Sequence, residues 1–146
     1  MSKNIQTEII INASKEKVWN ILTDFENYKS WNPFIIQSSG KAVAGTRLLN
    51  TMKNKESKMT FKPVILKVEK NNYFDWLGSL FFKGIFDGQH YFKIDDLGNG
   101  QIKLTQGENF SGILSSVILK SIGEETKNNF IKMNVALKQL AEERTN

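Results

Sequence analysis

The chain contains 146 residues, of which 40% are hydrophobic and 24% are charged, and its formal net charge is +5. This length is enough for one domain with a buried core, and we expect a single domain over residues 1–146. The sequence has no cysteine and one histidine. It therefore excludes disulfides, thiolate metal sites and multi-histidine metal cages, and we expect no metal and no cofactor.

The positive charge is spread along the chain rather than concentrated in one run. The lysines near the C-terminus alternate with acidic residues, namely Glu124, Glu125, Glu142 and Glu143. This pattern favours a solvated basic surface over a nucleic-acid interface. No apolar run approaches a membrane span, and residues 1–12 lack the apolar core of a signal peptide. We expect a cytoplasmic monomer or weak homodimer without nucleic-acid or integral membrane partners.

The N-terminal region predicts a strand followed by helical structure. Residues 4–12 (NIQTEIIIN) are rich in β-branched side chains, which favours a strand. Ser14 is a candidate N-cap. After it the apolar residues recur with the spacing of an amphipathic helix, at Val18, Trp19, Leu22 and Phe25. That helix must end before Pro33.

The stretch TDFENYKSWNPF (residues 23–34) carries four aromatic side chains. Tyr28 and Trp31 fall on a short second helix or turn, and Asn32 is expected to hydrogen-bond that turn locally.

From residue 40 to residue 110 strand patterns alternate with turn signals. The expected strands cover residues 40–46, 46–54, 58–70, 73–82, 87–96 and 100–110. Within residues 58–70, Pro63 interrupts the pattern. The apolar set there moves from Met59 and Phe61 to Val64, Leu66 and Val68, as at a bulge.

From about Ser111 the period becomes helical. The apolar residues of this long helix lie near one stripe, at Leu114, Val117, Ile118, Ile122, Phe130, Met133, Leu137 and Leu140. By the logic of packed layers the chain is an α+β protein, with a curved antiparallel sheet and the long helix across its concave face.

The last two strands bring the only histidine close to an acid. The turn LGNG (residues 97–100) predicts a hairpin in which paired residue numbers sum to about 197. His90 then lies opposite Gly107, with Gln106 and Glu108 on the diagonals, and all three polar side chains share the inner face with apolar neighbours. A glycine opposite His90 would leave room for the imidazole.

Two interpretations of His90 and Glu108 stay open. In the functional one, Glu108 orients the imidazole, and His90 donates to a ligand oxygen or acts as a general base. In the structural one, the two residues form a satisfied buried pair that only fixes the hairpin. We rank binding or structural roles ahead of catalysis, because an acid–base role requires a substrate pose.

Other candidates also have two interpretations. Trp76 is core packing or a cavity wall. Phe130 and Met133 face the sheet, either as filler or as a cavity lining that adapts to a ligand. Residues 78–86 (GSLFFKGIF) form a mobile gate, a membrane-touching lip or a hydrophobic plug. Arg47 is expected at the surface.

The element order and several segments resemble the START/Bet v1-like (SRPBCC) superfamily of polyketide cyclase/dehydrase and lipid-transport type. The segments that carry the resemblance are ASKEKVWNILTDFENYKSWNPF, TFKPVILKVEKNNYFDWLG, FDGQHYFKI, QGENFSGIL and FIKMNVALKQLAE. They span essentially the whole chain, and the likeness is greatest to small bacterial single-domain members without an assigned activity. The resemblance implies a helix-grip fold, with seven strands wrapped around the C-terminal helix and two short helices closing one end.

The same resemblance implies a cavity between helix and sheet that binds a small hydrophobic or amphipathic molecule, with a volume of roughly 300–1,000 Å³. The expected ligand-binding residues are Trp31, Phe34, Trp76, His90, Phe92, Gln106, Glu108, Phe130 and Met133. One alternative is a cyclase or dehydratase for a polyketide-like or aromatic substrate, with His90 and Glu108 as catalytic candidates. Another is a protein-interaction or chaperone-cofactor module.

Overall fold

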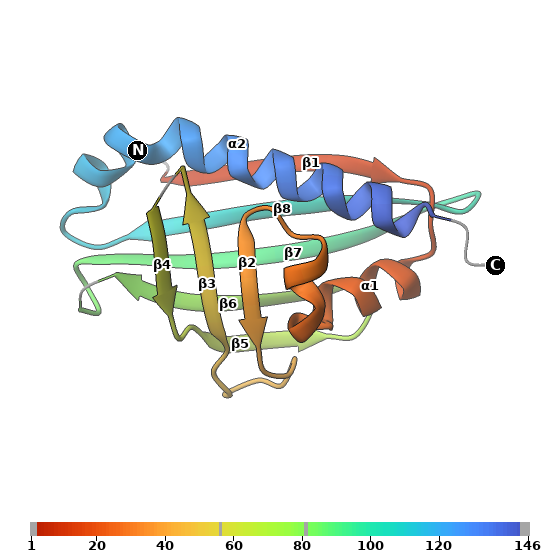
Figure 1. Cartoon of the computed structure of the whole chain (residues 1–146), viewed down its shortest axis with the longest axis horizontal. Helices are drawn as coiled ribbons and strands as arrows, with labels where there is room; N and C mark the ends of the chain where they lie inside the picture. Colours follow the sequence, from red (N-terminus) through yellow and green to blue (C-terminus); the bar gives the residue numbers. More distant parts are fainter. Residues whose placement is uncertain (1–2, 56, 81, 144–146) are drawn as a thin grey trace.

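The computed structural model describes residues 3–55, 57–80 and 82–143, and shows a curved sheet crossed by one long helix (Figure 1). The helical elements are α1 (Lys15–Thr23), a 3-10 helix (Phe25–Ser30) and α2 (Ser115–Ala141). The strands are β1 (Asn4–Ile11), β2 (Ile35–Ser39), β3 (Leu49–Asn54), β4 (Ser57–Phe61), β5 (Val64–Glu69), β6 (Tyr73–Leu80), β7 (Phe86–Gly98) and β8 (Gln101–Ser111). The predicted α+β class is confirmed.

The strands form two antiparallel sheets rather than one. The larger has the order β1-β8-β7-β6-β5 and the smaller the order β2-β3-β4. The described chain thus has eight strands, and the expected count of seven is corrected at Pro63, where residues 58–70 divide into β4 and β5. Proline has no N–H to donate to a neighbouring strand, which interrupts the strand at this position. Its carbonyl accepts from the Leu48 N–H at 2.9 Å. A bridge between Arg47 and Val64 still links the two sheets.

Two details of the strand prediction are wrong. Residues 40–46 form no strand, because Gly40 and Gly45 adopt φ values of +130° and +86° that turn the chain; the strand is β2, just before them. In β5 the buried residue is Ile65, whereas Leu66 is 46% exposed. The register irregularity lies between Ile65 and Val68, so the bulge falls after Pro63 rather than at it.

The first helix and its exit follow the sequence closely. Ser14 is the N-cap of α1, and its hydroxyl accepts from the Lys17 N–H at 3.1 Å. The 3-10 helix follows and buries Tyr28. Asn32 Oδ1 accepts from the N–H groups of Phe34 and Ile35, each at 2.9 Å, so the predicted local turn is confirmed.

Helix α2 begins later than expected, and its first turns lie outside the core. It starts at Ser115 rather than near residue 111. Met133 and Leu137 in its second half are fully buried, as predicted, but Leu114 and Val117 are 41% and 69% exposed. Figure 1 shows why: these turns lie at the end of the molecule where strands give way to connections.

The packed core fills the half of the molecule around α1. Trp19 meets Phe74 edge to face at 5.5 Å between ring centroids, and Phe74 stacks on Phe92 at 5.0 Å. All three side chains are buried, so packed aromatic rings fill the interior between α1 and the large sheet.

Candidate ligand cavity

A hollow lies in the other half, between β3–β4, the β6–β8 part of the large sheet and α2. It consists of two lobes of about 110 and 200 Å³. The lobes adjoin because they share lining residues, which are Met52, Met59, Phe86, Glu108, Phe110 and Ile122. Each lobe is smaller than the expected volume. The shared wall is apolar except for Glu108.

Two glycines create the space at the floor of the hollow. Gly78 of β6 pairs with Gly88 of β7. A Cβ atom on Gly88 would lie 1.9 Å from Glu108 Oε2, and one on Gly78 would lie 3.2 Å from the Phe61 ring. The missing side chains therefore make room for the Glu108 carboxylate and for the ring that closes the floor.

The strand register differs from the expected one by a single residue. His90 pairs with Glu108, Tyr91 with Gly107 and Phe92 with Gln106. The expected sum is too low because the hairpin turns one residue later than expected, with Gly98 paired to Gln101, and the ladder then shifts by one between Gly98 and Asp96.

Gly107 consequently makes room for Tyr91 rather than for His90. A Cβ atom on Gly107 would lie 2.3 Å from the Tyr91 hydroxyl oxygen.

His90 is fully buried between aromatic rings. Its imidazole stacks on Trp76 at 4.9 Å and meets the edge of Phe130 at 4.9 Å. Nδ1 lies 3.3 Å from Glu108 Oε1, and Nε2 lies 2.9 Å from Gln106 Oε1. The imidazole is not part of the lining of either lobe; it stands behind Glu108.

A chain of hydrogen bonds fixes the proton on His90 Nε2. The Thr7 hydroxyl donates to the main-chain carbonyl of Gln106 at 3.0 Å. The Thr7 hydroxyl oxygen is therefore the acceptor for Asn134 Nδ2, at 2.8 Å. Asn134 Oδ1 therefore accepts from Gln106 Nε2 at 2.6 Å. Gln106 Oε1 then faces the imidazole, and only a protonated Nε2 can donate to it.

This tautomer has a consequence for Glu108. Neutral imidazole with its proton on Nε2 presents a lone pair at Nδ1, and a carboxylate oxygen is also an acceptor. A favourable contact between Nδ1 and Glu108 Oε1 therefore requires one more proton between them. The pair is either an imidazolium with a carboxylate or an imidazole with a carboxylic acid. In the described part of the chain no hydrogen-bond partner is found for Oε2, which lies over Gly88.

The residues predicted for the site divide into two groups. Phe34, Trp76 and Glu108 line the hollow. The others lie outside its lining, namely Trp31, His90, Phe92, Gln106, Phe130 and Met133.

Trp31 differs most from its expected role as a ligand-binding residue. Its ring packs against Tyr28 with centroids 5.3 Å apart. Its buried Nε1 has no hydrogen-bond partner among the described residues.

Sequence reasoning missed most of the lining. Met52, Phe86, Phe110 and Ile122 line the hollow but were not among the expected site residues. The Gly78–Gly88 pair is the signal that could have located the hollow, because two facing glycines on neighbouring strands leave a gap on the sheet. The segment of residues 78–86 contributes Gly78, Ser79 and Phe86 to the lining and Phe82 to the surface, while its residue 81 lies outside the described residues.

The mouth of the second lobe is polar, and side-chain contacts there join the β3–β4 hairpin to α2. Lys55 Nζ lies 3.9 Å from Glu125 Oε2. With its amide nitrogen turned toward the helix, Asn54 donates to Glu125 Oε1 at 2.5 Å. Asn129 and Thr126 of α2 complete this rim. The hairpin thus covers the hollow and is fastened to the helix at its tip.

The comparison with protein families identifies the family of this chain. A family model described as polyketide cyclase/dehydrase and lipid transport matches residues 2–141. The chain belongs to this family. Comparison with curated proteins gave no match. Membership supports a ligand-binding or cyclase-type domain and is compatible with a small hydrophobic ligand.

Solved structures show the same fold at low sequence identity. A START superfamily protein from Mycobacterium smegmatis is 19% identical, with a TM-score of 0.72 over 95% of this chain and 97% of the other. An aromatase/cyclase from a Streptomyces species is 13% identical, with a TM-score of 0.74 over 95% and 93%. Norcoclaurine synthase from Thalictrum flavum, solved with dopamine and hydroxybenzaldehyde, is 14% identical, with a TM-score of 0.75 over 100% and 90%. These likenesses concern the fold alone.

Among the described residues of this family member, no helix is both long enough and apolar enough to cross a bilayer.

Proposed function

We propose that this protein binds a small apolar or amphipathic molecule in the hollow, with a polar group of the ligand at Glu108. The observation that carries the proposal is one carboxyl group set in an otherwise apolar wall shared by both lobes. Sites of this kind use apolar contacts for affinity and a few polar groups for orientation.

The geometry of Glu108 defines the polar group it selects. Oε1 is engaged by His90 at 3.3 Å, whereas Oε2 is available at the floor of the hollow. As a carboxylate, Oε2 accepts from a hydroxyl, a phenol or an amine. The side chain is 14% exposed, so such a hydrogen bond forms largely away from bulk water and is correspondingly stronger.

The size of the lobes limits the ligand. Volumes of about 110 and 200 Å³ suit a single ring or a short chain more than a large lipid. Met52 and Met59 line both lobes, and the flexible thioether side chain lets such a wall adapt to different shapes.

A thermal-shift and calorimetric panel tests the proposal. The probes are a phenol, an aromatic amine, a medium-chain alcohol and a matching alkane. A bound probe stabilises the fold by mass action, by about 2.7 kcal/mol at a hundredfold excess over its Kd. We expect Glu108→Gln to weaken the amine probe by about tenfold or more, the loss of a charge-assisted hydrogen bond, and to leave the alkane unchanged.

The control for this experiment is Glu8→Gln, which removes a carboxylate from the exposed face of β1. It should change the affinity of no probe. If no probe shifts the unfolding temperature of the wild-type protein, the binding proposal fails. If Glu108→Gln and Glu8→Gln behave alike, Glu108 is not the polar anchor.

A cyclase-type enzyme is the second candidate, and the contact between Glu108 Oε1 and His90 Nδ1 at 3.3 Å favours it. In this role Glu108 removes a proton from a carbon next to a ligand carbonyl, and His90 acts through Glu108 as a positioning residue. This reverses the roles expected from the sequence, since the carboxyl group and not the imidazole faces the hollow. We rank binding first, because an enzyme requires several convergent polar groups, and among the described residues the first lobe offers the polar side chains of Glu108 and Ser79.

Hydrogen–deuterium exchange at carbon distinguishes the two functions. The probe is a small aromatic methyl ketone in D₂O, followed by proton NMR with and without the protein. An acid–base role predicts accelerated exchange that Glu108→Gln reduces by about 10²–10⁴-fold. Exchange at the rate of the buffer would leave binding as the function.

A further inference from the structure

Two connections at one end of the molecule are fastened to each other. They are the β6–β7 connection (residues 82–85) and the β8–α2 turn (residues 112–114), and they lie together beside the start of α2 (Figure 1). The Ile113 N–H donates to the Gly84 carbonyl and the Leu114 N–H to the Ile85 carbonyl, each at 3.0 Å. Gly112 permits this approach, since its φ is +107° and a Cβ atom there would lie 2.4 Å from the Ile85 oxygen.

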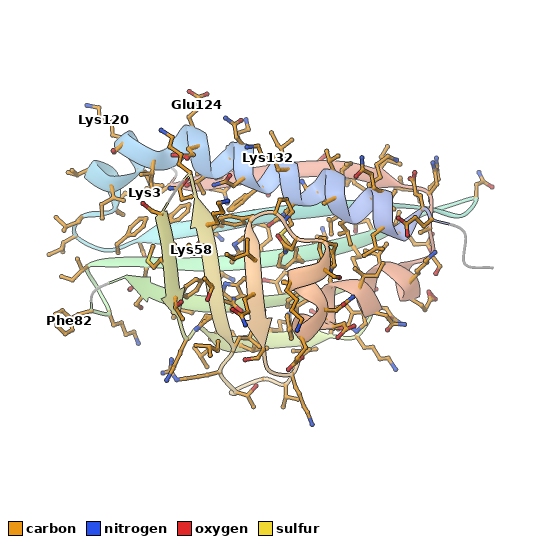
Figure 2. All side chains as sticks on the ribbon, in the orientation of Figure 1. Lys3, Lys58, Phe82, Lys120, Glu124 and Lys132 are labelled. Carbon is orange, nitrogen blue, oxygen red and sulfur yellow. The ribbon has the colours of Figure 1, made fainter. Side chains whose placement is uncertain are left out.

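Apolar side chains project from this end into solvent. Phe82 and Ile113 at the two tips are 78% and 79% exposed, and Val117 on the first turns of α2 is 69% exposed. Figure 2 shows Phe82 pointing away from the body of the molecule. Several large apolar side chains exposed together, on connections fixed by backbone hydrogen bonds, mark a contact surface rather than a frayed segment.

Basic side chains lie at the same end of the molecule. Lys83 is exposed beside Phe82, and Lys3, Lys120 and Lys127 line one groove between β1 and α2. Figure 2 shows Lys3, Lys120 and Phe82 at the same end. Lys3 is held there because its Nζ donates to Ser115 Oγ at 2.8 Å.

Acids contribute less to this end. Glu124 shares the groove with the lysines. Asp87 is only 8% exposed, and its Oδ2 accepts from the Gly84 N–H at 2.9 Å.

We propose that this end docks on the surface of an anionic bilayer. Phe82, Ile113 and Val117 enter the boundary between headgroups and acyl chains, while Lys83 and Lys120 contact anionic headgroups. An apolar anchor combined with basic residues is the combination that holds a protein at such a surface. Each lysine near an anionic surface adds to the attraction.

The same features disfavour a second copy of the chain as the occupant. In a symmetric dimer the identical patches would meet, and the lysines around each patch would face the lysines of the other. The apolar residues also stand on separate tips rather than forming one flat face, which suits a fluid lipid layer better than a rigid protein surface.

The docking surface adjoins the hollow. Phe86, directly after the β6–β7 connection, stacks on Phe110 at 5.4 Å, and both rings line the lobes. Docking would bring the hollow close to the bilayer, but the proposal does not depend on what the hollow binds.

Vesicle flotation tests the proposal. The probes are large unilamellar vesicles of phosphatidylcholine, alone or mixed with phosphatidylglycerol. We expect the wild-type chain to float with the anionic vesicles and much less with the neutral ones. The double variant Phe82→Ser with Ile113→Ser should bind the anionic vesicles at least about tenfold more weakly, because it removes both apolar anchors. Lys83→Glu with Lys120→Glu should show the same loss at low salt.

Matched controls remove equally exposed groups elsewhere. Ile10→Ser with Leu66→Ser changes two apolar residues that are 49% and 46% exposed on β1 and β5, and it should leave vesicle binding unchanged. Circular dichroism and the response to the phenol probe verify that each variant keeps its fold and its hollow.

Several results would overturn the docking proposal. One is the absence of vesicle binding, and another is binding that the Phe82 and Ile113 variant leaves intact. A loss of the same size in the Ile10 and Leu66 control would also contradict it. A wild-type dimer in sedimentation velocity that this variant dissociates, without vesicle binding, would assign the surface to a second copy.

Discussion

Glu108 lies directly opposite His90 on the neighbouring strand, with Oε1 3.3 Å from the imidazole Nδ1. One residue of the pair is fully buried, whereas the other lines the hollow. In the proposed function, the imidazole therefore reaches a ligand only through the carboxyl group.

The tautomer of His90 is the first testable consequence. We expect the neutral imidazole of the folded protein to carry its proton on Nε2, because Gln106 Oε1 offers only an acceptor at 2.9 Å. Long-range ¹H–¹⁵N NMR of the imidazole distinguishes the two nitrogens. A neutral ring with its proton on Nδ1 and a bare Nε2 would contradict the hydrogen-bond chain through Asn134 and Thr7.

Removal of the imidazole should destabilise the protein strongly. We expect His90→Ala to lower the free energy of unfolding by about 2–4 kcal/mol, since it opens a cavity among Trp76 and Phe130 and leaves Gln106 Oε1 without its donor. Urea denaturation measures this change. Lys93→Ala, an exposed position on the same strand, is the control and should stay within about 0.5 kcal/mol of the wild type. A loss below about 1 kcal/mol for His90→Ala would mean that the buried network contributes little.

Local signals in the sequence were sufficient for much of the fold. The Ser14 cap, the turn at Asn32 and the inward direction of His90 and Glu108 depend on contacts within a few residues or on the period of a strand. The division at Pro63 was visible as an interruption, but which sheet each half would join was not.

The details that escaped the sequence depend on contacts between distant segments. The register of the last hairpin differs by one residue because the turn lies one residue later than expected and the ladder is irregular next to Gly98. The position of the hollow depends on where the β3–β4 hairpin crosses β6–β8. The spacing of apolar residues in the sequence does not reveal this crossing. Val117 has the spacing of a buried residue yet is 69% exposed, because this part of α2 extends beyond the packed core.

The space above Gly88 should determine the polar specificity of the hollow. We expect Gly88→Ala to displace the Glu108 carboxylate, since the new Cβ atom would lie 1.9 Å from Oε2. The carboxylate is the far end of a flexible side chain, so overpacking should cost about 1–3 kcal/mol of stability rather than prevent folding. The calorimetric affinity for the amine probe should fall, while that for the alkane should change less.

Gly123 on α2 supplies the control for that substitution. A Cβ atom there would meet nothing within 4 Å, so Gly123→Ala should raise helix stability by about 0.5–1 kcal/mol and leave probe binding unchanged. Equal losses of amine and alkane binding in Gly88→Ala would indicate a general collapse of the hollow instead of a displaced carboxylate.

Glu142 fixes the C-terminal end of α2 to Asn12, which directly follows β1, and this contact should depend on pH. Its Oε2 accepts from Lys138 Nζ at 2.6 Å and from the Asn12 N–H at 2.7 Å. The hydrogen bond from Lys138, followed by the one from Asn12, lowers the pKa of Glu142 from its ordinary value of 4.5. A lowered pKa in the folded state means that the stabilisation is complete above the unfolded pKa and disappears as the pH falls through the folded pKa.

We therefore expect Glu142→Gln to unfold more easily than the wild type at pH 7 and equally at a pH well below 4.5. Urea denaturation across this range measures the difference, and Glu143→Gln, one residue along, serves as the control. A difference between wild type and Glu142→Gln that stayed constant at all pH values would show that the carboxylate charge is not what joins the two ends.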